Sequence, residues 1–240
     1  MQIFAGNFKM NKTQEETIEY FSSFLDFEPK CRVLIAVPFT SLAAAQKCPE
    51  WMEIGAQNVH FATSGAYTGE ISTTMLKEAG AKFSLVGHSE RRQYFGETDH
   101  TANLRAKAAL NDGLGVIFCI GENLLARQKG NVKRVLRRQL VKGLEGIESA
   151  KNLIVAYEPV WAIGTGEAAN DSQIEEVHVY VKKVLHKMFG CDVPVLYGGS
   201  VNEQNVARIC KLEGVDGALV GGASLSPQRM KELIARGTKN

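Results

Sequence analysis

The chain has 240 residues, of which 45% are apolar, and this is enough material for one large domain or two small ones with a full core. Its formal net charge of +2 argues against a protein dedicated to binding nucleic acid or a membrane surface. A slightly basic chain does not repel a small phosphate dianion. The charge therefore permits an anionic substrate.

The cysteines form no recognisable framework. They are odd in number, widely spaced and without a Cys-x-x-Cys pair, which predicts neither disulfides nor a zinc site: Cys31, Cys48, Cys119, Cys191 and Cys210. The first residues lack the charged segment of a secretory signal, and every apolar run is shorter than a membrane span. We expect a soluble cytoplasmic protein with reduced thiols, no metal, no cofactor and no membrane partner.

Eight short apolar runs alternate with longer helical patterns along the chain. They cover residues 3–5, 33–37, 54–56, 83–86, 116–120, 153–157, 193–196 and 218–220. Most are continuously apolar, which is typical of parallel strands covered on both faces. Eight strand–helix units without a linker predict an α/β fold, a closed (β/α)8 TIM barrel, as a single domain over residues 1–240. A doubly wound open sheet is the alternative.

Residues 171–190 show the helical pattern well. The apolar stripe consists of Ile174, Val177, Val181, Val184, Leu185 and Met188. Ser172 and Glu175 have the spacing of a capping box, and Gly190 is a suitable helix stop. We expect the stripe to face the core.

Three short motifs carry residues suited to catalysis. They are Gly87–Arg92 (GHSERR), Ala156–Gly166 (AYEPVWAIGTG) and Tyr197–Val201 (YGGSV). Together they supply a histidine that can polarise a carbonyl, a carboxylate that can take a proton, and glycine-rich turns whose N–H groups can hold a phosphate. This set favours proton transfer next to a carbonyl, without a metal or a nucleotide.

The candidate residues share one position relative to the expected strands. Asn7, His88, Glu158, Ser200 and Gly221 all lie at or just beyond a carboxyl end of a strand. Barrel active sites are built at this rim. We therefore expect these side chains to meet.

These motifs occur together with Gly6–Asn11 (GNFKMN), Gln57-Asn58, Gly65–Ser72 (GAYTGEIS) and Leu219–Leu225 (LVGGASL). In this order, and over the whole chain, they resemble the triosephosphate isomerase family. The resemblance implies interconversion of dihydroxyacetone phosphate and D-glyceraldehyde 3-phosphate through an enediolate, in glycolysis and gluconeogenesis. It also implies a homodimer and no cofactor.

The resemblance assigns a role to each catalytic position. Glu158 matches the base, and His88 matches a neutral imidazole electrophile that the start of the following helix keeps unprotonated. Lys9 and Asn7 match electrostatic stabilisers that also bind the substrate, and Glu90 matches the partner of Lys9.

The resemblance also implies a phosphate site and a lid. Backbone N–H groups of Gly164, Ser200, Gly221 and Gly222 would hold the phosphate. Residues 159–169 would form a mobile lid that closes over the phosphate. Ile163 of this lid would form a clamp with Leu219 that excludes water from Glu158.

The segment 57–72 is long for a connection in a barrel. It carries four apolar residues, Val59, Phe61, Ala66 and Tyr67, which is unusual in a monomer. It resembles the family's dimer loop, in which Thr68 would reach the partner's site near Asn11 and Lys9. An ordered surface loop is the alternative.

Seven basic residues cluster in one helical segment without acidic neighbours: Arg127, Lys129, Lys133, Arg134, Arg137, Arg138 and Lys142. A nucleic-acid stripe is conceivable. The segment shares its helix with Val132, Val135, Leu136 and Leu140 and has no interleaved aromatics for base stacking. We interpret it as a solvated helix face and expect no nucleic-acid partner.

Two other functions compete with the isomerase. A lysine-dependent aldolase needs a desolvated amine, for which the sequence gives no cue. A catalytically silent barrel that binds phosphorylated metabolites would lack the base, whereas Glu158 is present. The complete catalytic set favours the isomerase.

Overall fold

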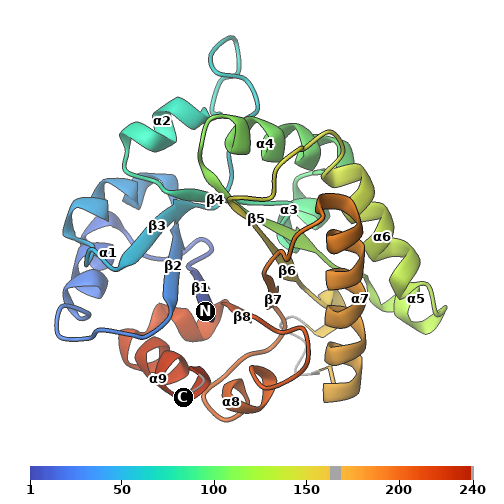
Figure 1. Cartoon of the computed structure of the whole chain (residues 1–240). Coiled ribbons are helices and arrows are strands. Elements are labelled where there is room, and N and C mark those ends of the chain that lie inside the picture. The colour runs from blue at the N-terminus through green and yellow to red at the C-terminus, as the bar shows by residue number, and fades with distance from the viewer. Residues whose placement is uncertain (163–168, 239–240) are drawn as a thin grey trace.

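The strands pair in chain order, each parallel to the next, and the last pairs with the first. The computed structural model describes residues 1–162 and 169–238. It shows the closed barrel that the sequence predicts, with an inner ring of strands and an outer ring of helices (Figure 1). The strands are β1 (Ile3–Asn7), β2 (Arg32–Val37), β3 (Met52–Ala56), β4 (Phe83–Val86), β5 (Gly115–Ile120), β6 (Leu153–Tyr157), β7 (Val195–Tyr197) and β8 (Gly217–Val220).

The helices connect consecutive strands around the outside. The α-helices are α1 (Gln14–Ser22), α2 (Thr73–Glu78), α3 (Ser89–Tyr94), α4 (Asp99–Asn111), α5 (Leu124–Gln128), α6 (Val132–Gly143), α7 (Asp171–Phe189), α8 (Val206–Ile209) and α9 (Pro227–Gly237). The 3-10 helices are η1 (Phe39–Lys47), η2 (Val160–Ala162) and η3 (Gly222–Leu225). Two connections depart from a regular unit, because η1 follows β2 and only the four-residue α8 follows β7.

The expected capping box of α7 is wrong. Asn170 is the N-cap, and its side chain and that of Gln173 exchange hydrogen bonds with each other's backbone N–H. Glu175 instead accepts a hydrogen bond from the N–H of Glu213 at 2.9 Å. The predicted stop is correct, since Gly190 adopts a left-handed conformation with φ of 69°.

Alternate residues of each strand face two different layers of core. The barrel interior is filled by Ile3, Ala5, Leu34, Ala36, Phe83, Leu85, Ile117, Cys119, Ile154, Ala156, Leu196 and Leu219. The other strand residues pack against the helices; Phe4, Val33, Val155 and Val195, for example, are all fully buried. Burial on both faces explains the continuously apolar strands.

No helix in the described part of the chain is long and apolar enough to cross a membrane. Nor do the described residues include a group of three His, Cys, Asp or Glu side chains that could hold a metal ion.

Candidate active site

The carboxyl ends of the strands surround a cavity of about 280 Å³. Its lining comes from β1, β4, β6, β7, β8 and the turns that follow them: Asn7, Lys9, His88, Glu158, Gly198, Gly199, Ser200, Val201, Asn202, Leu219, Gly221 and Gly222. The structure thus brings most of the candidate residues together at one rim. Segments separated by more than 200 residues meet there because the barrel closes.

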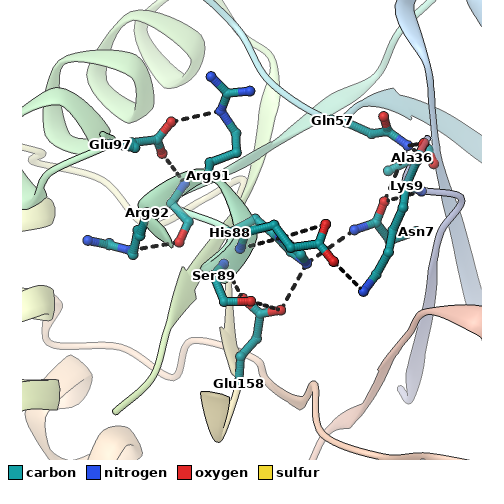
Figure 2. Close-up of polar contacts among 12 residues, drawn as sticks. Asn7, Lys9, Ala36, Gln57, His88, Ser89, Arg91, Arg92, Glu97 and Glu158 are labelled. Atoms are coloured by element: carbon teal, nitrogen blue, oxygen red, sulfur yellow. Dashed lines mark hydrogen bonds and ion pairs between the residues drawn. The ribbon is translucent and has the colours of Figure 1, made fainter. Parts of the chain in front are cut away.

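A buried polar contact joins the candidate electrophile and the candidate base (Figure 2). His88 Nε2 lies 3.0 Å from Glu158 Oε1, and the two residues are 5% and 3% exposed. His88 is the N-cap of α3, and its Nδ1 accepts the backbone N–H of Glu90 at 3.3 Å. In the neutral ring, therefore, Nε2 carries the proton and faces the cavity.

His88 and Glu158 shift each other's pKa. Burial alone lowers the pKa of His88, but the charge of Glu158 and its hydrogen bond outweigh burial, so the pKa is raised. Burial alone raises the pKa of Glu158, but His88, the N–H of Ser89 and Lys9 lower it below its ordinary value. Glu158 is therefore a carboxylate at neutral pH. The neutral state of His88, expected from the start of the following helix, stays a prediction.

Ser89 contacts both carboxylate oxygens of Glu158. Its backbone N–H donates to Glu158 Oε2 at 3.0 Å, and its hydroxyl lies 3.4 Å from Oε1 (Figure 2). Sequence reasoning gave Ser89 no role of its own within the motif Gly87–Arg92. The contact could have been predicted from the place of Ser89 at the start of α3, because the first N–H groups of a helix lack intrahelical partners and are free to bind a carboxylate.

Lys9 is held in place by both its side chain and its backbone. Its Nζ lies 2.6 Å from Glu90 Oε1, as the resemblance implied, and its own N–H donates to Asn7 Oδ1 at 2.9 Å. Its φ of 52° is in the left-handed region, which a non-glycine residue adopts only at a cost. With this backbone conformation, Lys9 lines the cavity.

Asn7 and His88 place two nitrogen atoms side by side. Asn7 Nδ2 lies 3.2 Å from His88 Nε2, and Asn7 is 4% exposed. Gln57 holds the other end of the Asn7 amide, because its Nε2 donates to Asn7 Oδ1 at 3.3 Å and to the carbonyl of Lys9 at 2.7 Å. With Oδ1 accepting these bonds, the Nδ2 donor of Asn7 faces the imidazole (Figure 2).

Glycines allow the turns after β7 and β8 to approach the catalytic groups. A Cβ on Gly198 would lie 3.0 Å from Glu158 Cγ, and one on Gly221 would lie 3.3 Å from Lys9 Cε. Ser200 donates its hydroxyl to the carbonyl of Ala162 at 2.9 Å. This leaves its backbone N–H as the group that a bound anion could use.

The lid expected over residues 159–169 is described only at its two ends. Ile163, Gly164 and the other residues up to 168 lie outside the described residues, so the clamp, the phosphate contact of Gly164 and the closure stay predictions. The opposite member of the expected clamp, Leu219, is 4% exposed and lines the cavity.

The described start of this segment is fastened to the barrel. Trp161 Nε1 donates to Glu122 Oε1 at 2.8 Å, and Arg127 Nε donates to the same oxygen at 2.8 Å. The Arg127 guanidinium also lies 5.0 Å from the ring of Trp161. Sequence reasoning missed this anchor because Glu122 lies outside the motifs.

A second hollow of about 260 Å³ lies on the other side of Lys9 and His88. It is lined mainly by apolar groups, including Met10, Phe39 and Phe95. Thr68 is exposed on the segment 57–72 and does not line the catalytic cavity of its own chain. This segment projects from the rim of the barrel between β3 and α2 (Figure 1).

The basic segment is partly neutralised by acids from elsewhere. Lys133 pairs with Glu176, and Arg138 pairs with Asp99. Leu136 and Leu140 of α6 are fully buried, so the segment has the solvated outer face and the packed inner face that were expected.

A parallel (β/α)8 barrel with an imidazole, a carboxylate, an ammonium group and glycine-rich turns at its carboxyl rim defines a class, the barrel enzymes that act on small phosphorylated substrates. Comparison with known proteins gives the family. The family model described as triosephosphate isomerase matches residues 2–237.

Three relatives described as triosephosphate isomerase have similar sequences over almost their full length. That of Acaryochloris marina is 46% identical over 96% of both chains, and that of Synechocystis is 44% identical over 97% of both. That of Chlorobium luteolum is 42% identical over 98% of both. The chain belongs to the triosephosphate isomerase family, as its motifs predicted.

Membership of this family gives the activity. The protein is an intramolecular isomerase that acts on triose phosphates, in glycolysis and gluconeogenesis. The predicted fold, activity and substrate class are confirmed.

Proposed function

We propose that Glu158 is the base of the isomerisation, that His88 is the electrophile, and that Asn7 and Lys9 stabilise the enediolate. The observation that carries these roles is the meeting of all four side chains in one cavity, with Glu158 3.0 Å from His88 Nε2 and Asn7 Nδ2 3.2 Å from it. Glu90 acts through Lys9, since its carboxylate holds the ammonium group in place.

The two N–H donors suit one developing negative charge. In the neutral ring, His88 Nε2–H and Asn7 Nδ2–H can both donate to the carbonyl oxygen of the substrate. Glu158 takes a proton from the carbon beside that carbonyl and returns it to the former carbonyl carbon. His88 moves the remaining proton, giving Nε2–H to one oxygen and receiving the hydroxyl proton of the other.

Binding of the substrate would also free the base. The carbonyl oxygen would replace Glu158 as the acceptor of the His88 N–H. Once it is separated from Glu158, His88 loses the interaction that raises its pKa, and burial then favours the neutral ring. Once Glu158 no longer contacts His88, it loses an interaction that lowers its pKa, so it becomes a stronger base. The exchange of partners therefore prepares both groups for their roles.

Backbone N–H groups of Ser200, Gly221 and Gly222 bind the phosphate in this proposal. All three residues line the same cavity as the acid–base pair, in the turns after β7 and β8. Barrel phosphate sites recur at these two loops. Gly164 is expected to add a fourth N–H on the basis of the family resemblance alone.

We also propose a homodimer in which segment 57–72 enters the partner's second hollow. The segment carries Phe61 and Tyr67, which are 37% and 47% exposed, and the hollow is bordered by Met10 and Phe95, which are 96% and 69% exposed. Joining these surfaces would remove apolar area from water. Thr68 of this segment would then lie near Asn11 and Lys9 of the partner.

The proposed unit of function is the whole chain, residues 1–240, as one barrel domain in the cytoplasm. The closed strand order supports one domain, because all eight strands are needed to complete the rim. Four free thiols, Cys31, Cys48, Cys119 and Cys191, and the family's place in glycolysis support a reducing compartment.

The roles are tested by coupling dihydroxyacetone phosphate formation to an NADH-linked dehydrogenase, without added metal. Glu158→Asp withdraws the carboxylate by one methylene, and His88→Gln removes the imidazole. Each is expected to lower kcat by about 100-fold or more. Glu175→Asp, which makes the same change outside the site, is the control and should leave kcat unchanged. Full activity in either site variant would contradict its assignment.

A further inference from the structure

Arg105 of α4 lies outside the cavity but holds two segments that border it. Its side chain is 11% exposed, and its Nη1 donates to Asn58 Oδ1 at 3.1 Å and to the backbone carbonyl of Val59. The same nitrogen lies 3.5 Å from Glu70 Oε2. One guanidinium thus connects the first and last parts of the segment 57–72.

The other side of the guanidinium faces the turn that carries His88. Arg105 Nε lies 3.7 Å from Glu97 Oε2, in an ion pair. The Glu97 side chain is 2% exposed, and its Oε1 accepts the backbone N–H of Gly87 at 2.6 Å. Arg91 Nε donates to Oε2 at 3.0 Å (Figure 2). Glu97 therefore links Arg105 to Gly87, which directly precedes His88.

Asn58 connects Arg105 to the opposite wall of the site. Its chain neighbour Gln57 donates to the carbonyl of Lys9 at 2.7 Å, to Asn7 Oδ1 at 3.3 Å and to the carbonyl of Ala36 at 3.4 Å (Figure 2). These bonds orient the Asn7 amide and hold the strained backbone of Lys9. Any shift at Asn58 would move Gln57 and, with it, both groups.

We propose that Arg105 is a positioning residue for the isomerisation: it joins the Gln57-Asn58 stem to the Glu97–Gly87 turn and so fixes the spacing between Asn7 and His88. The planar guanidinium suits this task, because one rigid head can reach a carbonyl, an amide oxygen and two carboxylates from different sides. A lysine ammonium is a compact point charge and could not reach all of these acceptors at once. The inference rests on the proposed roles of Asn7, Lys9 and His88.

Arg105→Met retains most of the side-chain volume and removes the charge and the donors. We expect kcat to fall about 10- to 100-fold, because a displacement of about 1 Å between reacting groups has an effect of this size. KM should change much less, since the phosphate turns after β7 and β8 do not contact Arg105. Arg105→Lys should restore part of kcat, because it keeps the charge near Glu97.

Arg32→Met is the matched control. Arg32 makes a two-bond ion pair with Glu53, at 2.6 and 2.9 Å, and it lies at the start of β2, away from the rim that carries the site. This variant loses an equivalent arginine–glutamate pair and should keep kcat. All proteins are compared at concentrations at which sedimentation shows the same association state.

Equal kcat values for a folded Arg105→Met and the Arg32→Met control would overturn the proposal. So would a loss that disappears at high protein concentration, since the effect would then come from association. If Arg105→Met does not fold, Arg105→Lys is compared with the wild type instead. A kcat of Arg105→Lys equal to that of the wild type would then contradict the positioning role of Arg105. If Glu158→Asp and His88→Gln lose activity while both Arg105 variants keep it, positioning fails and the proposed roles stand.

Discussion

The backbone around Glu158 leaves no room for a side chain on its neighbour Gly121. A Cβ on Gly121 would lie 1.8 Å from the carbonyl oxygen of Glu158. The loop that carries Gly121 cannot easily retreat, because Gln139 is 5% exposed and binds both its N–H, at 2.9 Å, and its carbonyl, at 3.0 Å. The clash must therefore move Glu158.

Gly121→Ala is expected to lower kcat at least about 10-fold, because it displaces the base from its reacting position. The assay of triose phosphate conversion measures this. Gly113→Ala is the control: its φ of 84° strains any side chain, but nothing lies within 4 Å of the added Cβ. It should lower stability by about 1 kcal/mol and leave kcat unchanged. Similar kcat losses in Gly121→Ala and Gly113→Ala would contradict the prediction, because the loss would then not come from displacement of Glu158.

Within α7, His178 is buried as a neutral side chain. It is fully buried between the rings of Tyr157 and Tyr197, at 5.9 and 6.2 Å, and its Nδ1 lies 3.2 Å from the carbonyl of Gly214. Its Nε2 has no hydrogen-bond partner among the described residues. Burial lowers the pKa of His178 to about 4, with Lys182 adding to this and the Gly214 carbonyl and Asp216 opposing it.

This histidine should make the fold sensitive to acid. The unfolded chain binds a proton on His178 near pH 6.5, whereas the folded chain binds it only near pH 4. Stability from this residue is therefore complete above pH 6.5 and is lost as the pH falls toward 4, by up to about 3 kcal/mol.

Urea unfolding between pH 4 and 7.5 measures the effect. His178→Gln should reduce the dependence of unfolding free energy on pH in the acidic range. His186→Gln, on the exposed part of the same helix, should leave that dependence as in the wild type. The same acid sensitivity in all three proteins would exclude His178 as its source.

The association of two chains should depend on the apolar tip of segment 57–72. Tyr67 is 47% exposed, and its ring lies tilted against that of His60, with ring centroids 4.3 Å apart. Tyr67→Asp should weaken dimerisation by about 2 kcal/mol or more, because it places a charge in an apolar interface. Sedimentation measures the dissociation constant, and specific activity should fall on dilution at the same concentrations. Unchanged association would contradict the proposed interface.

The barrel was predictable because its strands are buried on both faces. The runs 83–86 and 153–157 have the observed bounds of β4 and β6. Other ends were missed because pairing between strands continues past the apolar run: β1 extends to Asn7, which pairs with Ala36. The prediction for the seventh strand, residues 193–196, also differs from the structure, where β7 begins at Val195. Pro194 has no N–H to donate and supplies only its carbonyl, which accepts the N–H of Val155.

The capping of α7 could not be decided from the pattern alone. Asn170 with Gln173, and Ser172 with Glu175, both have capping spacing, and Glu175 turned out to bind the backbone of Glu213, which is 38 residues away.

The site was predictable as a set of motifs but not as a network. His88, Glu158 and the glycine turns stand at strand ends that any closed barrel brings together. The contacts of Ser89 with Glu158 and of Gln57 with Asn7 join residues 69 and 50 positions apart. No local spacing encodes such contacts, so the structure was needed to find them.

Hydrogen exchange in D2O tests most directly whether Glu158 carries the proton. The wild type should return a solvent-derived deuteron to the substrate, so that NMR detects deuterium on the product carbon. Glu158→Gln keeps the shape but removes the base, and it should slow both isomerisation and deuterium incorporation by about 1000-fold while the protein stays folded. Incorporation at the wild-type rate in Glu158→Gln would contradict the account, since another group would then be moving the proton.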